Sequence, residues 1–221
     1  MNTLFKLALL FLMALVTACK SDFYIDTYAS DLFLDTNLDT PAQMMVEIPS
    51  CASVVDYETK VLALFDTASK AKIIGCEEQG MNSMLVVSLT AEVASENSAR
   101  DIILFRDIVE DVTHDGSTYE VRGLKPVISP NFFTRVNSLL QENLQTLSYE
   151  NITIRFALNN DEKGEILVTA RNLWVNGEAQ ETFYRQPLAR RGKLELLMSN
   201  LISDLVIQGK QPLTFYVYRP K

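Results

Sequence analysis

The stretch DIILFRDIVEDVTHDGSTYEVRGLKPVI, residues 101–128, decides the fold class. The spacing of apolar residues in its first part fits either a helix or a strand. The dipeptide Asp115-Gly116 resolves this ambiguity, because Asp-Gly is a strong signal for a two-residue β-hairpin turn. The residues after the turn have the composition of a strand. We therefore pair residues 102–110 with residues 117–127 as an antiparallel hairpin.

Toward the N-terminus, the same reasoning predicts strands and one helix. The segment DFYIDTYASDLFL alternates, with Phe23, Ile25 and Thr27 on one side, as expected of a half-buried strand. A later segment carries apolar side chains at helical spacing. The elements predicted before the hairpin are strands at 22–34 and 43–49, a helix at 54–68, and strands at 71–77 and 82–93.

Toward the C-terminus, two more helices are predicted. Ser129 provides an N-cap and Pro130 the first position of one helix. Leu194, Leu197 and Leu201 have the spacing of another, and Gly209 suits its C-terminal cap. The elements predicted after the hairpin are a helix at 130–146, strands at 151–158, 164–175 and 178–188, a helix at 191–208, and a strand at 213–219.

The predicted order is typical of an α+β fold, mostly antiparallel sheet packed by about three helices. Residues 22–94 and 101–174 both read as ββαββ units, and EIPS before the first predicted helix resembles VISP before the second. This pattern suggests an internal duplication. Because no linker rich in Pro or Gly divides the chain, we expect residues 19–221 to form a single domain.

Residues 1–18 have the features of a secretory signal peptide. Lys6 supplies the positive charge, Leu7–Val16 is apolar throughout, and Thr17 and Ala18 are small. The ten apolar residues, at about 1.5 Å of rise each, cannot cross a hydrocarbon core about 30 Å thick. We therefore expect the segment to be removed rather than to remain as a membrane span.

The sequence VTAC at residues 16–19 resembles the lipobox of bacterial lipoproteins. The resemblance implies that the Cys19 thiol receives a diacylglyceryl group, that the peptide before it is cleaved, and that the new N-terminus is acylated. Two or three acyl chains anchor a protein stably. Lys20, in the next position, favours the outer membrane, facing the periplasm; the inner membrane and the cell surface stay open. The alternative is an ordinary signal peptide followed by a chance cysteine.

The net charge and the cysteine content indicate which partners and which cross-links to expect. The formal net charge of −8 argues against a nucleic-acid partner, because such binding depends on clustered Lys and Arg. Besides Cys19 the chain contains Cys51 and Cys76, and in an oxidising periplasm such a pair predicts a disulfide. The bridge would stabilise the fold by roughly 3–4 kcal/mol. Two thiols with one distant histidine do not make a zinc site.

The chain contains few residues that suggest catalysis or metal binding. The single histidine, His114, lies beside the Asp-Gly turn, where we expect a solvated side chain rather than a catalytic base. Residues 35–39 begin like a calcium-binding loop, but Thr40 stands where that loop needs glycine. We therefore predict no enzymatic activity, no metal and no cofactor.

One basic cluster, Arg190, Arg191 and Lys193, stands at the start of the helix predicted at 191–208. The N-terminus of a helix disfavours cations. This misfit suggests contact with lipid phosphates or an acidic partner. Side chains that simply reach solvent explain it equally well.

Several short motifs carry a resemblance to a known group. The lipobox is followed by YIDTYASDLF at 24–33, by VEIPSC at 46–51, and later by LWVNGE at 173–178. The chain resembles small uncharacterised lipoproteins of proteobacteria, phages and prophages. The resemblance implies an envelope role, such as altering the host surface, and assigns no catalytic residues.

The sequence thus leads to three functional hypotheses. The first is a non-enzymatic, lipid-anchored envelope protein that binds another envelope component, a protein or a lipid, through a sheet edge or a helix face. The second is a periplasmic carrier of a lipid or other apolar ligand. The third is a hydrolase whose site is not recognisable from sequence.

Overall fold

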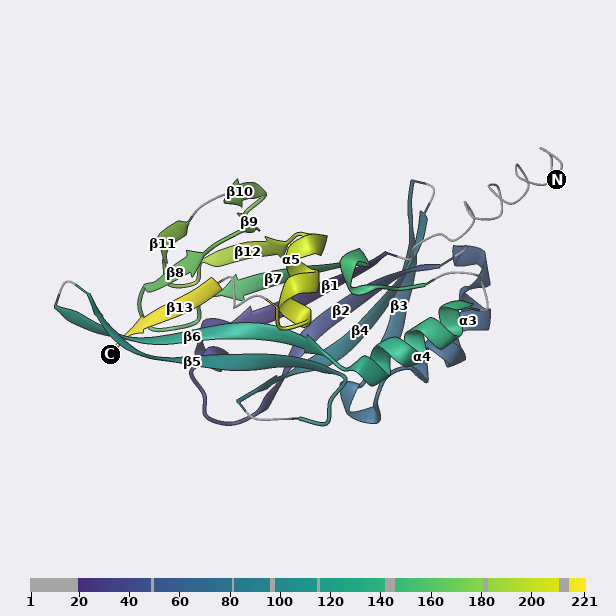
Figure 1. The fold of residues 1–221 in the computed structure, drawn as a ribbon, viewed down its shortest axis with the longest axis horizontal. Helices are drawn as coiled ribbons and strands as arrows, with labels where there is room; N and C mark the ends of the chain where they lie inside the picture. Colours follow the sequence, from purple (N-terminus) through teal and green to yellow (C-terminus); the bar gives the residue numbers. More distant parts are fainter. Residues whose placement is uncertain are drawn as a thin grey trace, which may run out of the picture.

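The computed structural model describes residues 20–221 except 49, 81, 96–97, 115, 142–145, 181–182 and 211–214. Within these residues the protein is an α+β molecule made mostly of sheet (Figure 1), so the predicted fold class is confirmed. The strands form one large sheet that curls until it is nearly closed; α3 and α4 lie at one end of it, and α5 lies between β7 and β6.

The elements are labelled as in Figure 1. The strands are β1 Ser21–Tyr28, β2 Leu38–Ile48, β3 Lys72–Gln79, β4 Asn82–Ala94, β5 Ile102–His114, β6 Ser117–Ile128, β7 Ile152–Asn159, β8 Ile166–Ala170, β9 Leu173–Val175, β10 Glu178–Gln180, β11 Tyr184–Leu188, β12 Lys193–Met198 and β13 Phe215–Pro220. The α-helices are α2 Ala29–Leu32, α3 Val54–Leu62, α4 Pro130–Leu140 and α5 Asn200–Ile207. Short 3-10 turns are η1 Cys51–Ser53, η2 Thr67–Ser69 and η4 Tyr149–Asn151.

The strand order is β10-β9-β12-β7-β1-β2-β4-β5-β6-β13-β8-β11, with β3 beside β4. Two neighbouring pairs, β1 with β7 and β4 with β5, run parallel. The remaining pairs are antiparallel, as predicted. The β4–β5 contact is short, from Glu92 opposite Ile103 to Ala94 opposite Phe105. It joins two halves of the sheet that share one hydrophobic core.

The core lies between these halves. On β1 the predicted alternation is confirmed, because Phe23, Ile25 and Thr27 are each at most 2% exposed. Phe156 of β7 and Phe215 of β13 come from different halves, yet their ring centroids are 5.3 Å apart. Burial of such large apolar side chains is the main favourable contribution to folding. The interior is therefore filled by side chains.

Helix α4 begins as the sequence predicts. The Ser129 hydroxyl accepts a hydrogen bond from the Asn131 backbone N–H at 3.2 Å, and Pro130 occupies the first turn. The buried face includes Phe132, whose ring centroid lies 5.3 Å from that of Phe65. The helix ends at Leu140, earlier than predicted. Residues 142–145 of the predicted helix lie outside the description.

The prediction of one continuous helix at 191–208 is wrong. Its first part is strand β12, and only its second part is helix α5. The burial of Leu194, Leu196 and Met198 alternates with exposed or partly exposed residues, which is the period of a strand. The Ser199 hydroxyl then accepts a hydrogen bond from the Ile202 backbone N–H at 3.4 Å and caps α5. The leucines at helical spacing therefore belong to two different elements, β12 and α5.

The proposed ββαββ repeat is not confirmed. In the first unit β3 pairs with β4. In the second unit β7 pairs with β1 and β12, whereas β8 pairs with β11 and β13. The single strands predicted at 164–175 and 178–188 are each divided in two. The two halves of the chain therefore build the sheet differently.

The helix count also differs from the prediction. Four α-helices occur within the described ranges, because the end of the strand predicted at 22–34 forms the short helix α2. The helix predicted at 54–68 ends as α3 at Leu62. From Lys20 onward, no described helix has the length and apolar character needed to cross a membrane.

Candidate binding face

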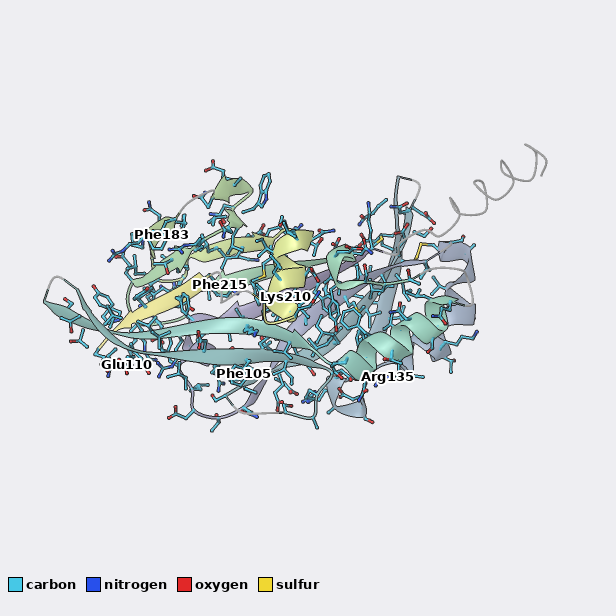
Figure 2. The ribbon with its side chains drawn as sticks, viewed as in Figure 1. Phe105, Glu110, Arg135, Phe183, Lys210 and Phe215 are labelled. Carbon is cyan, nitrogen blue, oxygen red and sulfur yellow. A yellow bond between two sulfur atoms is a disulfide. The ribbon has the colours of Figure 1, made fainter. Side chains whose placement is uncertain are left out.

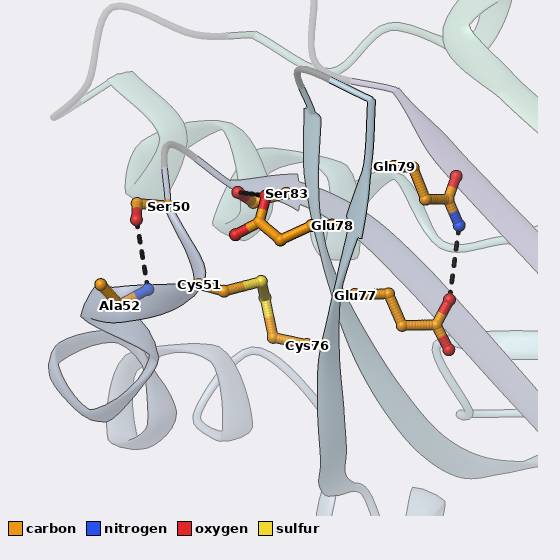
Figure 3. The surroundings of a disulfide bond; sticks show 8 residues. All are labelled: Ser50, Cys51, Ala52, Cys76, Glu77, Glu78, Gln79 and Ser83. Atoms are coloured by element: carbon orange, nitrogen blue, oxygen red, sulfur yellow. Dashed lines mark hydrogen bonds between the residues drawn. A yellow bond between two sulfur atoms is a disulfide. The ribbon is translucent and has the colours of Figure 1, made fainter.

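The predicted disulfide is confirmed. Cys51 and Cys76 are bridged, with their Cα atoms 5.6 Å apart (Figure 3). Cys51 opens η1, where the Ser50 hydroxyl accepts a hydrogen bond from the Ala52 backbone N–H at 3.1 Å. Cys76 lies on β3, whose register with β4 shifts beside it. The bridge therefore ties the start of the α3 region to β3. Cys19, the predicted lipidation site, and the signal peptide lie outside the described residues.

The predicted basic cluster is in a different setting from the one expected. Arg190 and Arg191 lie in a turn, and Lys193 is the first residue of β12. The dipole argument for these residues is therefore wrong, because no helix begins there. The Arg191 backbone N–H donates to the Asn160 carbonyl at 2.7 Å, and the Lys193 ammonium donates to the Tyr24 hydroxyl at 3.3 Å. All three side chains are exposed.

A shallow pocket on the outer face of the sheet was not predicted. We call it the distal pocket. It has a volume of about 130 Å³ and is lined by Val112, Tyr119, Leu167, Thr169, Phe183, Arg185 and Tyr218. Its walls are cross-strand pairs: Val112 lies opposite Tyr119, and Tyr218 lies opposite Leu167. Directly opposed side chains have Cβ atoms about 4.5–5.5 Å apart, so each pair forms one continuous apolar surface.

A β-bulge in β5 brings Val112 to this face. Val109 lies opposite Val121 and Val112 lies opposite Tyr119, so β5 contains one residue more than β6 over the same span. Side chains along a strand alternate between faces, and an extra residue reverses which side chains point outward. Without the bulge, Val112 would share the inner face with Arg106 rather than the outer face with Val109.

The pocket combines exposed apolar groups with polar ones. Phe183 is 52% exposed and Val112 is 39% exposed. The Arg171 guanidinium carbon lies 5.9 Å from the Phe183 ring centroid, within the range of a cation–π contact. Beside the pocket, the Tyr216 hydroxyl donates to Asp107 at 3.2 Å. Burial, followed by the charge of Asp107, raises the pKa of Tyr216, so this hydroxyl stays protonated.

A charged network on the inner side of the same strands supports the face. Arg219 of β13 donates to Glu120 at 2.6 Å and to Glu162 at 3.0 Å. Its guanidinium carbon lies 4.1 Å from the Phe33 ring centroid. Arg122 forms an ion pair with the same Glu120. Because Glu120 is shared by Arg122 and Arg219, these charges form a network rather than isolated pairs.

At the start of α2, Ser30 binds the carboxylate of Asp161. The Ser30 hydroxyl donates to Asp161 at 2.5 Å, and the Ser30 backbone N–H donates to the other oxygen of the same carboxylate at 3.0 Å. Burial raises the pKa of the neighbouring Asp31, and the charge of Asp161 adds to this rise. This arrangement fixes the start of α2. Among the residues that the structure describes, no group of His, Cys, Asp or Glu is suited to hold a metal.

The distal pocket and the β3–β4 hairpin lie in opposite halves of the molecule (Figures 1 and 2). Lys20 lines a polar pocket of about 240 Å³ together with Gln79 and Asn82 of the β3–β4 hairpin. In Figure 2, Phe183 and Glu110 lie at the other end, toward the C-terminus. Lys20 and the distal pocket are therefore well separated along the molecule.

One known family matches most of the chain. A family model described as a domain of unknown function, DUF7424, matches residues 23–220. The chain belongs to the DUF7424 family. No curated protein and no solved structure matches it. The DUF7424 match begins in β1 and ends in β13, so it includes the disulfide and all seven residues of the distal pocket.

Proposed function

We propose that this DUF7424 protein is a non-enzymatic, lipid-anchored protein of the bacterial envelope that binds a partner protein at its distal pocket. Cys19 carries the lipid, and the folded domain stands on the outer membrane, facing the periplasm. The observation that carries the proposal is an apolar, tyrosine-lined pocket in the half of the molecule away from the β3–β4 hairpin, beside which Lys20 lies.

The composition of the pocket favours a protein partner. Tyrosine, phenylalanine and arginine are the residues enriched at the centres of protein interfaces. The pocket volume of about 130 Å³ is close to that of an engineered apolar cavity of about 150 Å³ that takes up benzene. The site therefore fits one apolar or aromatic side chain of the partner. An effect on the host surface, as implied by the resemblance to phage lipoproteins, would act through this contact.

The carrier hypothesis has less support. A carrier needs a continuous apolar cavity of roughly 300–1,000 Å³. The pocket of about 240 Å³ is lined mostly by polar side chains, and the open pocket of about 430 Å³ includes the charged residues Asp66, Glu92 and Arg100. Between the halves of the sheet, Phe156, Leu196 and Phe215 are completely buried. Side chains thus occupy the space that an apolar ligand would need.

Membrane fractionation of the wild type beside Cys19→Ala tests the anchor. We expect the wild type in the membrane fraction, with acyl mass on Cys19, and the variant in the soluble fraction, because one thioether carries the lipid. A wild type without acyl mass would contradict the anchoring part of the proposal.

Photo-crosslinking in the native host tests the binding face. A photoreactive amino acid at position 183 should give a discrete protein adduct, which a Val112→Asp substitution should remove. Position 55 is the matched control, because Val55 is 81% exposed and lies on α3 at the other end of the molecule. Adducts of equal yield from both positions, or an adduct insensitive to Val112→Asp, would contradict the proposed face.

A further inference from the structure

The polar pocket beside the β3–β4 hairpin gathers neutral polar side chains from separate parts of the chain. It has a volume of about 240 Å³. The residues that line it are Lys20, Asp22, Gln79, Asn82, Met84, Asn151, Thr153 and Asn200. Four of these side chains end in an amide, one carries a hydroxyl, and Met84 is the apolar member. The polar pocket thus differs in chemistry from the distal pocket, whose lining includes three aromatic rings.

The topology of the sheet brings these side chains together. Asp22 of β1 lies opposite Thr153 of β7 in their parallel pairing. Gln79 of β3 lies opposite Asn82 of β4 at the end of the hairpin. Two further asparagines reach the pocket from η4 and α5, which pack against each other. The site is therefore a product of long-range contacts rather than of one polar loop.

The polar groups of the pocket are accessible to a ligand. Every polar side chain of the lining is at least partly exposed, and Asn200 and Gln79 are fully in the exposed class. Met84 is the buried lining residue, at 4% exposure. The volume of about 240 Å³ exceeds that of an apolar cavity of about 150 Å³ that takes up benzene. The pocket therefore has room for one six-membered ring with polar substituents.

The pocket presents hydrogen-bond donors and acceptors side by side. The Thr153 hydroxyl donates to the Asn200 amide oxygen at 2.8 Å. The hydroxyl oxygen can still accept, and the Asn200 amide carries two N–H donors. Among the described residues, no hydrogen bond uses these N–H groups. The Asn151 amide donates to the Ser148 hydroxyl at 2.7 Å, which leaves its oxygen as a further acceptor.

The charges in the pocket argue against an ionic ligand. Lys20 and Asp22 are its two charged lining residues, and they have opposite signs. They lie two positions apart in the chain, so their charges largely compensate each other. Phosphate sites are built from clustered Arg and Lys. An apolar ligand would leave the amide groups without hydrogen-bond partners, which is costly.

We propose that the polar pocket binds one neutral sugar ring. Neighbouring hydroxyls of a sugar ring each donate and accept, which matches the pairing of the Asn200 N–H groups with the Thr153 oxygen. One ring hydroxyl accepts from Asn200, and the next one donates to Thr153. The Asn82 amide, on the opposite wall, binds the other side of the ring. This inference depends neither on the lipid anchor nor on the distal pocket.

NMR titration of the ¹⁵N-labelled full-length protein, in a detergent without a sugar head group, tests this inference. The probes are glucose, galactose, mannose and N-acetylglucosamine, with inorganic phosphate as the anionic control. We expect at least one sugar to bind at millimolar concentration and to shift the side-chain amide signals of Asn82 and Asn200. The signal of Asn131, an exposed asparagine on α4, should not move.

The methyl glycoside of the best sugar distinguishes two sources of the ring. If it binds as well as the free sugar, the anomeric position points out of the pocket, as required for a ring within a glycan chain or a lipid head group. If only the free sugar binds, the ligand is a soluble monosaccharide. Either result supports a sugar site.

Protein variants assign the contacts. Thr153→Val keeps the shape of the side chain, and we expect it to weaken binding about two- to tenfold because one neutral hydrogen bond is lost. Thr118→Val, on an exposed part of β6, is its matched control. Asn200→Leu should weaken binding at least as much. Asn131→Leu, in the first turn of α4, is the control for that change and should not alter the affinity.

Three results would overturn the inference. The first is that no sugar shifts the pocket signals at millimolar concentration. The second is that a sugar binds but Thr153→Val and Asn200→Leu leave its affinity unchanged. The third is that phosphate shifts the Asn82 and Asn200 signals more than any sugar does, which would identify an anion site. The spectra of the variants also show whether each variant is folded, so a loss of binding is not confused with unfolding.

Discussion

Arg106 is the largest completely buried side chain of the described core, at 1% exposure. Its guanidinium donates to the backbone carbonyls of Asp31 at 3.1 Å and Thr36 at 2.6 Å, and to the Ser95 hydroxyl at 2.9 Å. Burial lowers its pKa, while the charges of Asp31 and Asp35 act in the opposite direction. One residue of β5 thus fixes both the loop before β2 and the end of β4.

We expect Arg106→Met to lower the free energy of unfolding by about 2–4 kcal/mol, because the buried guanidinium's hydrogen bonds to two backbone carbonyls are lost while the side-chain volume stays similar. Urea denaturation with a two-state fit measures this change. Arg155→Met is the matched control, because Arg155 is exposed on β7. If both variants were equally stable, the buried hydrogen bonds would have no net effect on stability.

Asp66 predicts a pH dependence of stability. Burial alone would raise its pKa, but hydrogen bonds from the Asp101 and Ser69 backbone N–H groups outweigh burial and hold the pKa below its ordinary value of 3.8. A carboxyl whose folded pKa is lowered stabilises the fold above the unfolded pKa. That contribution is lost as the pH falls through the lower, folded pKa.

We therefore expect Asp66→Asn to be less stable than the wild type at pH 7 by about 1 kcal/mol, a value kept small because the group is partly solvated. The difference should shrink as the pH falls below 3.8, since the wild-type carboxyl then becomes neutral as well. Thermal unfolding of both proteins between pH 2.5 and 7 measures this. A difference that stays constant over this range would contradict a role for the ionised carboxylate.

At the scale of secondary-structure elements, strand β3 is held in place by a disulfide bond as well as by pairing. It pairs with β4 along Lys72–Gln79, and the Cys51–Cys76 bridge links it to η1. The two cysteines are 25 residues apart. Replacing both by alanine should lower the free energy of unfolding by about 3 kcal/mol, because the unfolded chain regains the entropy of an open loop.

Denaturation with and without a reducing agent checks this prediction. Reduction should bring the stability of the wild type close to that of the double variant and should leave the double variant unchanged. If reduction did not affect the wild type, the bridge would not contribute to stability.

Local signals were sufficient for some elements. The Asp115-Gly116 dipeptide predicted the β5–β6 hairpin, and the observed register places Ser117 opposite His114. Ser129 and Pro130 predicted the start of α4. Each of these signals depends on residues close together in the chain, so the chemistry of a turn or a cap decides the structure.

Other elements depended on contacts that the local pattern does not contain. In the stretch KLELLMSNLISDL, leucines fit a helix, but β7 and β9 are the neighbours that make Leu194–Met198 a strand. The parallel pairing of β1 with β7 joins residues more than a hundred positions apart. Ser199 was the one local signal that could have placed the start of α5 correctly.

The distal pocket was missed for the same reason. Its residues come from β5, β6, β8, β11 and β13 and from Phe183, and a bulge in β5 decides that Val112 belongs to it. Sequence patterns reveal the strands, but not which faces of distant strands meet.

On the scale of the whole molecule, the proposed anchor and the proposed binding face are separated along the long axis. Lys20, next to the proposed lipidation site, lines the polar pocket with Gln79 of the β3–β4 hairpin, whereas Phe183 lies in the opposite half of the molecule (Figure 2). If a lipid anchors the N-terminus, the half of the domain that contains Gln79 should lie closer to the membrane than the half that contains Phe183. The described residues near the anchor would then lie closest to the lipid head groups.

Fluorescence quenching tests this orientation. A fluorescent amino acid is placed at position 79 or 183 of the lipidated protein, which is bound to vesicles that contain a lipid with a nitroxide head group. We expect strong quenching at position 79 and little at position 183, because contact quenching requires the probe to reach the head groups. Detergent, which disperses the vesicles, should abolish the difference. Equal quenching at both positions would mean that the domain lies flat, and the distal pocket would then face the membrane rather than a protein partner.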